Sequence, residues 1–126
     1  MAAPKNPKPT EITLHQKSHM LEIAFDDGKR FELSAEYLRV NSPSAEVQGH
    51  GPGQEVLQIG KQDVNIKKIE PVGSYAVQFF FDDNHDTGIY SWETLYRLGM
   101  DMDTLWPNYL KRLKEAGHVR PEPKHR

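Results

Sequence analysis

The chain has 126 residues, of which 37% are hydrophobic and 27% charged, and this length gives one domain with a core and excludes a second full domain. It contains no cysteine, which excludes disulfide bonds, thiolate nucleophiles and zinc or iron-sulfur sites built from its own thiolates. The formal net charge is -2, and the basic residues gather near the two ends around an acidic middle, which argues against nucleic-acid binding.

The beginning of the chain has neither membrane nor signal character. No apolar run approaches the roughly 20 residues that a transmembrane helix needs, and MAAPKNPKPTE lacks the apolar core of a secretory signal. We therefore expect a cytoplasmic protein with no membrane partner. Residues 1–10 combine proline with lysine and predict a flexible lead-in.

Three antiparallel strands are expected at the start of the domain. Apolar residues alternate with polar ones around 12–14, 21–25 and 31–33. Asp27-Gly28 stands between the second and third of these segments and suits a tight turn that needs positive φ. The pattern therefore predicts a hairpin whose apolar side chains share one face.

A short helix and a long loop follow. Ser34 can cap a helix over Ala35–Val40. Residues 41–54 hold three glycines and two prolines with almost no apolar content, which predicts a loop. Strand character returns weakly at 55–59 and more clearly at 64–72.

The strongest strand pattern covers Tyr75–Phe81. We expect this strand to be central in its sheet, because both of its faces carry apolar side chains. One face is expected to carry Tyr75, Val77, Phe79 and Phe81, and the other Ala76 and Phe80.

The last third of the chain predicts a polar turn and two helices. The turn covers 82–88 and leads through Ile89-Tyr90 to a helix that Ser91 can cap and Gly99 can stop. A final helix is expected over 107–116, with Pro107 at its first position. The fold class is therefore α+β: a small antiparallel β-rich domain with a few short helices packed on the sheet, and a C-terminal helix.

Four stretches together resemble a known family in order and spacing over about residues 11–98: FDDG at 25–28, LSAEYLR at 33–39, GSYAV at 73–77 and HDTGIYSWETL at 85–95. The family is the gamma-butyrobetaine hydroxylase-like N-terminal domain, also called domain of unknown function 971. The resemblance implies a domain that stands alone in bacteria, is fused to iron-sulfur carrier-type P-loop ATPases in some plastid proteins, and precedes an oxygenase domain in carnitine-pathway enzymes. Its standalone members have no settled activity.

The resemblance divides the chain into four parts. After the lead-in of 1–10, the family domain covers 11–99, a C-terminal helical extension covers 100–117, and a flexible basic tail covers 118–126.

The family resemblance also implies a metal site that this sequence does not preserve. In the oxygenase relatives the domain holds zinc through three cysteines and one histidine. The cysteine positions fall on Ser42, Ser44 and Val47, and the histidine position on His85. Serine is a poor zinc ligand at neutral pH and valine is none. We therefore expect no metal and no cofactor.

The acidic turn, residues 82–86, allows two further interpretations. It partly matches a calcium-binding EF-hand loop, but the glycine is displaced by one position and a strand precedes it where a helix is required. His85 beside Asp83 or Asp86 could act as an acid-base pair. No nucleophile motif accompanies these residues, and no histidine begins the H-x-[DE] motif of an iron oxygenase. A polar β-turn is favoured.

We therefore expect a monomeric, non-enzymatic binding or adaptor domain that engages an unidentified protein partner through the acidic turn and the loop 41–54. The alternative is a metal-binding or iron-sulfur-related accessory protein that uses His85 and nearby carboxylates. A small enzyme using His85 and Asp83 is a third hypothesis that rests on their proximity alone. The candidate partner-binding residues are Asp82, Asp83, His85, Asp86, Tyr90 and Trp92.

Overall fold

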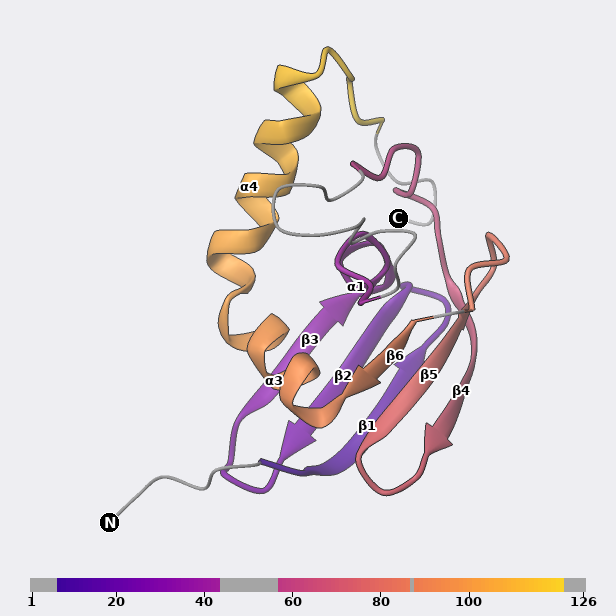
Figure 1. Cartoon of the computed structure of the whole chain (residues 1–126), viewed down its shortest axis with the longest axis vertical. Coiled ribbons are helices and arrows are strands. Elements are labelled where there is room, and N and C mark those ends of the chain that lie inside the picture. The colour runs from indigo at the N-terminus through magenta and orange to yellow at the C-terminus, as the bar shows by residue number, and fades with distance from the viewer. Residues whose placement is uncertain (1–6, 44–56, 87, 122–126) are drawn as a thin grey trace.

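The computed structural model describes residues 7–43, 57–86 and 88–121, and this part of the chain forms two three-stranded antiparallel sheets and three helices. The α+β class is confirmed, with the strands divided between two sheets (Figure 1). The first sheet has the order β1 (Pro9–His15), β2 (Met20–Phe25), β3 (Arg30–Ser34), and the second has the order β4 (Ile66–Val72), β5 (Ala76–Phe81), β6 (Ile89–Ser91).

The first sheet follows the predicted alternation. Ile23 on β2 pairs with Ile12 on β1 and with Phe31 on β3, so the three side chains share one face. Gly28 has φ +89° in the turn between β2 and β3, and its amide donates to Phe25 O at 3.1 Å. The tight turn at Asp27-Gly28 is therefore confirmed.

In the second sheet β5 is central, as predicted, and pairs with both β4 and β6. Its inner residues Val77, Phe79 and Phe81 are buried. The expectation for Tyr75 is wrong, because β5 begins only at Ala76 and the Tyr75 side chain is 60% exposed in the preceding turn.

Two other strand boundaries also differ from the expectation. The strand expected over 64–72 begins at Ile66. Residues 57–59 form no strand, and 55–56 lie outside the described residues.

Both predicted serine caps are confirmed. Ser34 Oγ accepts a hydrogen bond from the Tyr37 amide at 3.0 Å and begins α1 (Ala35–Val40). Ser91 Oγ accepts from the Thr94 amide at 3.1 Å and begins α3 (Trp92–Met100). In both cases the capping serine is the last residue of a strand, and the helix starts at the next residue.

The boundary between the last two helices was predicted wrongly. Gly99 lies inside α3, and α4 (Met102–Glu115) starts well before Pro107, which lies inside it. Asp101 alone separates the two helices, and its carbonyl accepts the amides of Thr104 and Leu105 at 3.0 and 2.8 Å. A single residue therefore ends one helix and begins the next, without the glycine stop that the sequence suggested.

The core lies between the inner faces of the two sheets and the helices that cover them. Figure 1 shows α3 beside β3 and α4 continuing from it, while α1 lies at the end of β3. Tyr37 on α1 donates its hydroxyl to Leu98 O of α3 at 2.5 Å, and burial raises its pKa to about 12. Within the described residues, no helix has the length and apolar character needed to cross a bilayer.

The segment after α4 folds back on the domain. Arg120 donates from Nε and Nη2 to the two carboxylate oxygens of Glu36, at 2.9 and 2.5 Å, and its guanidinium lies 5.5 Å from the Trp106 ring centre. Part of the predicted flexible tail is therefore held against α1 and α4, because Glu36 is almost fully buried and needs a partner.

Gly99 provides a test of the packing between α3 and the first sheet. A Cβ atom at this position would lie 2.5 Å from Cγ of Phe31. Overpacking costs about 1–3 kcal/mol and the better helix propensity of alanine returns about 1 kcal/mol, so Gly99→Ala should destabilise the domain. Urea unfolding followed by tryptophan fluorescence measures the change. The loss should shrink in a Phe31→Leu background; an equal loss there would contradict the proposed clash.

Candidate functional site

The acidic turn joins β5 to β6 and closes on itself through backbone hydrogen bonds. Phe81 N donates to His85 O at 3.0 Å, and Asn84 N donates to Phe81 O at 3.3 Å. Asn84 has φ +69°, a conformation that asparagine tolerates better than most residues. The side chains of the acidic turn alternate in direction: Asp83 and His85 point into the domain, while Asp82, Asn84 and Asp86 are exposed.

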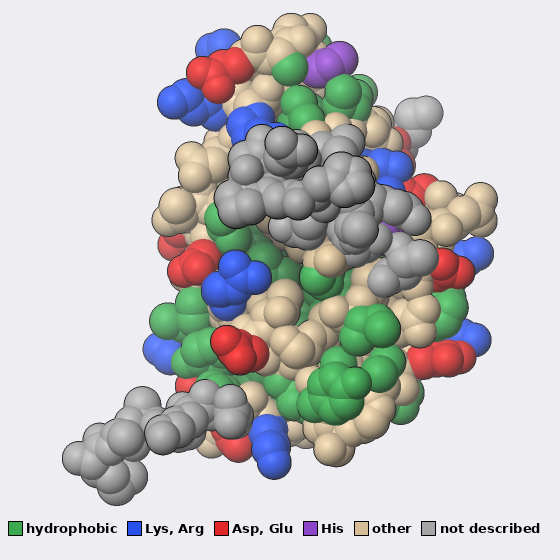
Figure 2. Space-filling model, viewed as in Figure 1, with side chains coloured by type: hydrophobic (Ala, Val, Ile, Leu, Met, Phe, Trp, Pro, Cys, Tyr) green, Lys and Arg blue, Asp and Glu red, His purple; other side chains and the backbone are tan. Residues whose placement is uncertain are grey.

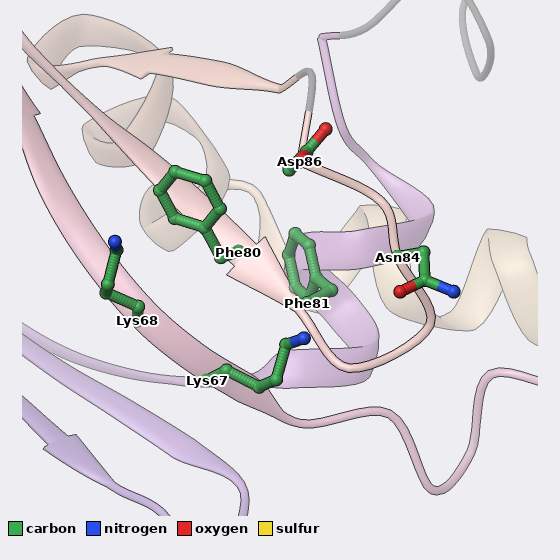
Figure 3. A pocket seen from close by; sticks show the side chains of 6 residues that line it. All are labelled: Lys67, Lys68, Phe80, Phe81, Asn84 and Asp86. Carbon is green, nitrogen blue, oxygen red and sulfur yellow. The ribbon is translucent and has the colours of Figure 1, made fainter.

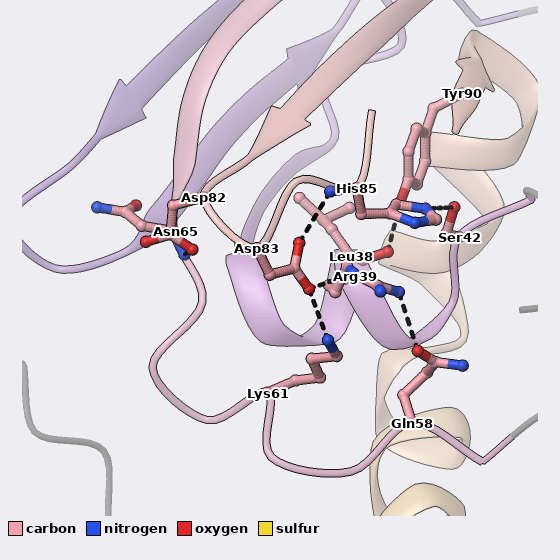
Figure 4. Close-up of polar contacts among 10 residues, drawn as sticks. All are labelled: Leu38, Arg39, Ser42, Gln58, Lys61, Asn65, Asp82, Asp83, His85 and Tyr90. Carbon is pink, nitrogen blue, oxygen red and sulfur yellow. Dashed lines mark hydrogen bonds and ion pairs between the residues drawn. The ribbon is translucent and has the colours of Figure 1, made fainter. Parts of the chain in front are cut away.

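Asp83 is the inner anchor of the acidic turn (Figure 4). Its Oδ2 atom accepts from Lys61 Nζ at 2.7 Å and from Arg39 Nε at 2.9 Å, and its Oδ1 atom accepts from the His85 amide at 3.2 Å. Arg39 also donates to Gln58 Oε1 at 3.1 Å. Three segments that are distant in sequence therefore meet at one carboxylate.

The surroundings of Asp83 favour its charged form. Burial alone would raise the pKa of its carboxyl, but the hydrogen bond from Lys61 and the positive charge of Arg39 outweigh this and hold the pKa below its usual value. The Asp83 side chain is only 21% exposed. It is thus an internal ion-pair partner, and its carboxylate is already saturated.

His85 and Ser42 form a second internal contact. His85 Nε2 lies 2.9 Å from Ser42 Oγ, and both residues are buried. The hydroxyl of Tyr90, also fully buried, donates to Leu38 O at 2.6 Å near the C-terminal end of α1. Gly88 leaves room for the contact between Ser42 and His85, because a Cβ atom at position 88 would lie 2.5 Å from Ser42 Oγ.

The structure separates the predicted partner-binding residues into two groups. His85 and Tyr90 are buried, and their side chains fill the interior beside α1 instead of facing the surface. Asp83 is turned inward in the same way. Asp82 and Asp86 remain exposed, although Asp82 Oδ1 accepts from Asn65 N at 3.0 Å.

Trp92, the sixth predicted partner-binding residue, is half-buried at the start of α3. Its Nε1 atom donates to Ser74 O at 2.9 Å, which fixes the indole against the turn between β4 and β5. With Tyr75, Ser91 and Glu93, it lines a hollow of about 370 Å³. Figure 2 shows hydrophobic side chains at the surface over this lower end of the sheets, where β5 begins.

A second hollow, of about 380 Å³, lies at the other end of β5 beside the acidic turn. Its lining residues are Lys67, Lys68, Phe80, Phe81, Asn84 and Asp86 (Figure 3). Lys68 lies over the Phe80 ring, with Nζ 4.8 Å from the ring centre, and pairs with Glu70 at 2.6 Å. We call this the turn hollow.

The two hollows flank the outer face of the second sheet, defined here by Glu70, Gln78, Phe80 and Ile89. Gln78 pairs with Glu70 on one side and Ile89 on the other, so their side chains point away from the buried inner face. The Ile89 side chain is 47% exposed.

Several residues of this site were missed by the sequence analysis. Nothing near Arg39, Gln58 or Lys61 marks them as partners of Asp83, because the chain must fold before these segments meet. Lys67 lies in the strand expected over 64–72, and nothing in that pattern marks it as a site residue. The alternation in β5 did place Phe80 opposite the inner face, and that signal was correct.

The residues at the zinc positions of the oxygenase relatives do not form a matching donor set here. Ser42 offers a hydroxyl, the nitrogen of His85 that faces it is 2.9 Å away, and the Asp83 carboxylate is bound by two cations. Among residues 7–43, 57–86 and 88–121, no three His, Cys, Asp or Glu side chains converge in a way that could hold a metal ion. Ser44 and Val47 lie outside the described residues. The EF-hand interpretation is also wrong, because strand β5 stands where its first helix would have to be.

Comparisons with known proteins agree with this fold. A family model described as gamma-butyrobetaine hydroxylase-like, N-terminal, matches residues 12–96. A structure solved by NMR is 53% identical, with a TM-score of 0.79, and covers 98% of this chain and 92% of that chain. A second NMR structure is 44% identical, also with a TM-score of 0.79, over 94% of this chain and 93% of that chain.

A crystal structure from Acidithiobacillus ferrooxidans is also similar. That protein belongs to the DUF971 family and has unknown function; it is 38% identical, with a TM-score of 0.62, over 73% of this chain and 92% of that chain. No curated protein matches significantly.

The anchoring role of Asp83 predicts a pH-dependent stability. Asp83→Asn should cost about 1–3 kcal/mol near neutral pH, the scale of hydrogen bonds to charged groups. Because the folded-state pKa is lowered, this contribution is present above the unfolded pKa of about 3.9 and lost as the pH falls through the folded value. Urea unfolding of both proteins from pH 7 to pH 3 should therefore give a difference that shrinks at acidic pH.

The exposed Asp86 supplies the matched control for this measurement. Asp86→Asn should change stability by no more than about 0.5 kcal/mol, as is usual for surface substitutions. If Asp86→Asn lowered the free energy of unfolding as much as Asp83→Asn, the stabilisation would come from the overall charge of the turn and not from the internal ion pairs of Asp83.

Proposed function

We propose that this chain, which belongs to the gamma-butyrobetaine hydroxylase-like N-terminal family, is a non-enzymatic binding domain for a protein partner. One member of this family with a known structure has no assigned function. The partner contacts the outer face of the second sheet together with the exposed side of the acidic turn. The observation that carries this proposal is that, among the described residues, this face carries the exposed Ile89 on its edge strand β6 and is bordered by the two hollows.

The way the outer face is built supports a binding role. Among the described residues, the helices pack chiefly against β3, β6 and each other, while the Ile89 side chain stays 47% exposed and Phe80 is half-buried. Beside this face, Tyr75 is exposed in the turn before β5, with its ring over Gly73 and its carbonyl accepting the Trp92 amide at 3.0 Å. Exposed aromatic side chains are common anchors at interfaces.

The acidic turn supports the same role. Asp83 is fixed internally by Arg39 and Lys61, and this holds Asp82 and Asp86 in a defined outward position. A pre-organised charged turn favours a specific partner over non-specific contact. The loop 41–54 was also expected to take part, but residues 44–54 lie outside the described structure and the proposal does not depend on them.

A non-enzymatic role is supported by the internal use of the groups that could carry chemistry. His85 is buried with Nε2 beside Ser42, and the Asp83 carboxylate is bound by two cations, so neither is available to exchange a proton with a substrate. We further propose that the protein is a cytoplasmic monomer that binds neither nucleic acid nor membrane. Its acidic central region supports this part of the proposal.

Ile89→Lys tests the binding face. Immobilised wild-type protein and the variant are incubated with a cell extract of the source organism, and retained proteins are quantified by mass spectrometry. The lysine should reduce retention of the specific partner by about tenfold, since placing a charge in an apolar contact costs at least about 1.4 kcal/mol.

Met100→Lys is the matched control, because Met100 is 50% exposed at the end of α3 and receives the same charge. It should retain the partner fully. Equal loss in both variants, or full retention by Ile89→Lys, would refute the proposed face; thermal unfolding checks that both remain folded.

We also propose that the Ser42–His85 contact replaces the zinc site of the oxygenase relatives. The contact of 2.9 Å supports this, because it brings together two positions that the family resemblance assigns as ligands. The alternative, a metal or iron-sulfur accessory role for His85, requires the histidine to leave Ser42 and find other donors.

Restoring the cysteines tests this replacement. A variant with Ser42→Cys, Ser44→Cys and Val47→Cys should gain tight cobalt and zinc binding, seen as thiolate-to-cobalt absorption, and His85→Ala in that background should weaken it. Wild-type protein should show no saturable zinc binding at micromolar metal. Tight binding by wild type that His85→Ala abolishes would instead establish the metal-binding alternative.

A further inference from the structure

We propose that the turn hollow is a peptide-anchoring site that takes an apolar side chain of the partner flanked by one acidic and one basic residue. This inference rests on the proposed binding function and specifies the chemistry of its ligand. The observation behind it is that Lys67 and Asp86 line the same hollow as the Phe80 ring.

The charged groups of the turn hollow are positioned for an outside ligand. Lys67 belongs to β4 and Asp86 to the acidic turn, so they border the hollow from two different segments (Figure 3). Neither side chain forms an ion pair within the described part of the chain, whereas the neighbouring Lys68 pairs with Glu70 and Asp83 pairs with Lys61. The hollow therefore offers one positive and one negative charge to a ligand.

The apolar part of the hollow is the Phe80 ring. Phe80 projects from the outward side of β5 and is half-buried, with Lys68 above its ring and the buried Phe81 next to it. An aliphatic or aromatic side chain placed on this ring would lose water-exposed area on both partners. Burial on Phe80 supplies affinity, and the charges of Lys67 and Asp86 set the orientation.

The edge of β4 excludes another common way of binding a peptide. A partner could in principle add a strand to this edge, since β4 has a neighbour on one side only. Gln16 Nε2, however, already donates to Ile66 O and Lys67 O, at 3.2 and 3.4 Å, and Pro71 cannot donate a backbone hydrogen bond. Gln16 and Pro71 therefore disfavour strand addition at this edge, and the proposed partner binds through its side chains.

The shape of the hollow favours a peptide over a free small molecule. Four of its six lining residues, Lys67, Lys68, Asn84 and Asp86, are exposed. Sites for small molecules enclose most of their ligand. A shallow hollow that continues into the outer face fits one anchoring side chain of a longer segment.

The test uses capped synthetic peptides and amide chemical shifts of the full-length protein. The probes carry the cores Glu-Leu-Lys and Lys-Leu-Glu, each with and without glycine spacers; Gln-Leu-Gln is the uncharged control, and free leucine represents a small zwitterion. One charged order should give saturable shifts at Lys67, Phe80, Asn84 and Asp86. Gln-Leu-Gln should bind several-fold more weakly.

Variants separate the charge contribution from the apolar one. Lys67→Ala should weaken binding of the preferred peptide by about threefold to fivefold, the scale of an exposed ion pair, and Lys111→Ala on the exposed surface of α4 should leave it unchanged. Lys67→Glu should lose the preferred peptide and bind the version whose glutamate is replaced by lysine.

Three outcomes would overturn the inference: equal affinity for Gln-Leu-Gln, shifts that map away from the turn hollow, or free leucine that binds as well as the peptides. Absence of saturable binding by every probe would overturn it too. The Ile89→Lys capture experiment is independent of these probes. If Ile89→Lys still lowers partner capture by about tenfold, only the peptide chemistry has failed, and the proposed binding function stands.

Discussion

The ion pairs of Asp83 are the interaction on which the arrangement of the site depends. One carboxylate holds Arg39 from α1 and Lys61 from the segment before β4, and it also accepts the His85 amide. Because the acidic turn is short, fixing Asp83 inward turns its immediate neighbours outward. The carboxylates of the turn thus have two roles: Asp83 forms internal ion pairs, and Asp82 and Asp86 face the solvent.

The interior beside the acidic turn is closed by polar side chains that satisfy one another. Ser42 contacts His85, and the Tyr90 hydroxyl donates to Leu38 O. This carbonyl lies in the last turn of α1, where carbonyl groups have no hydrogen-bond donor within the helix. Burial raises the pKa of the Tyr90 hydroxyl, so this group remains a neutral donor. Gly88 is needed for the close approach of these groups, which gives a physical reason for the glycine in the HDTGIYSW segment.

The division of the strands into two sheets decides which strand residues face outward. In the described part of the chain, the inner residues of both sheets and of the helices share one buried core, while Lys68 and Glu70 of β4 stay exposed and Phe80 of β5 stays half-buried. Lys67, Lys68 and Pro71 on β4 are also residue types that protect an edge strand from unwanted pairing.

The sequence by itself determined the α+β class, the first three strands, both serine caps and the central position of β5, because each depends on local alternation or on a capping side chain. It also indicated the family, through short motifs that keep their order. Only the tertiary structure decided that Asp83 and His85 point inward, that Tyr90 is buried while Tyr75 is exposed, and that Pro107 lies inside α4. The inward direction of Asp83 and His85 depends on Arg39, Lys61 and Ser42, which are distant in sequence and meet the acidic turn only in the folded chain. Pro107 lies inside α4 because that helix already begins at Met102.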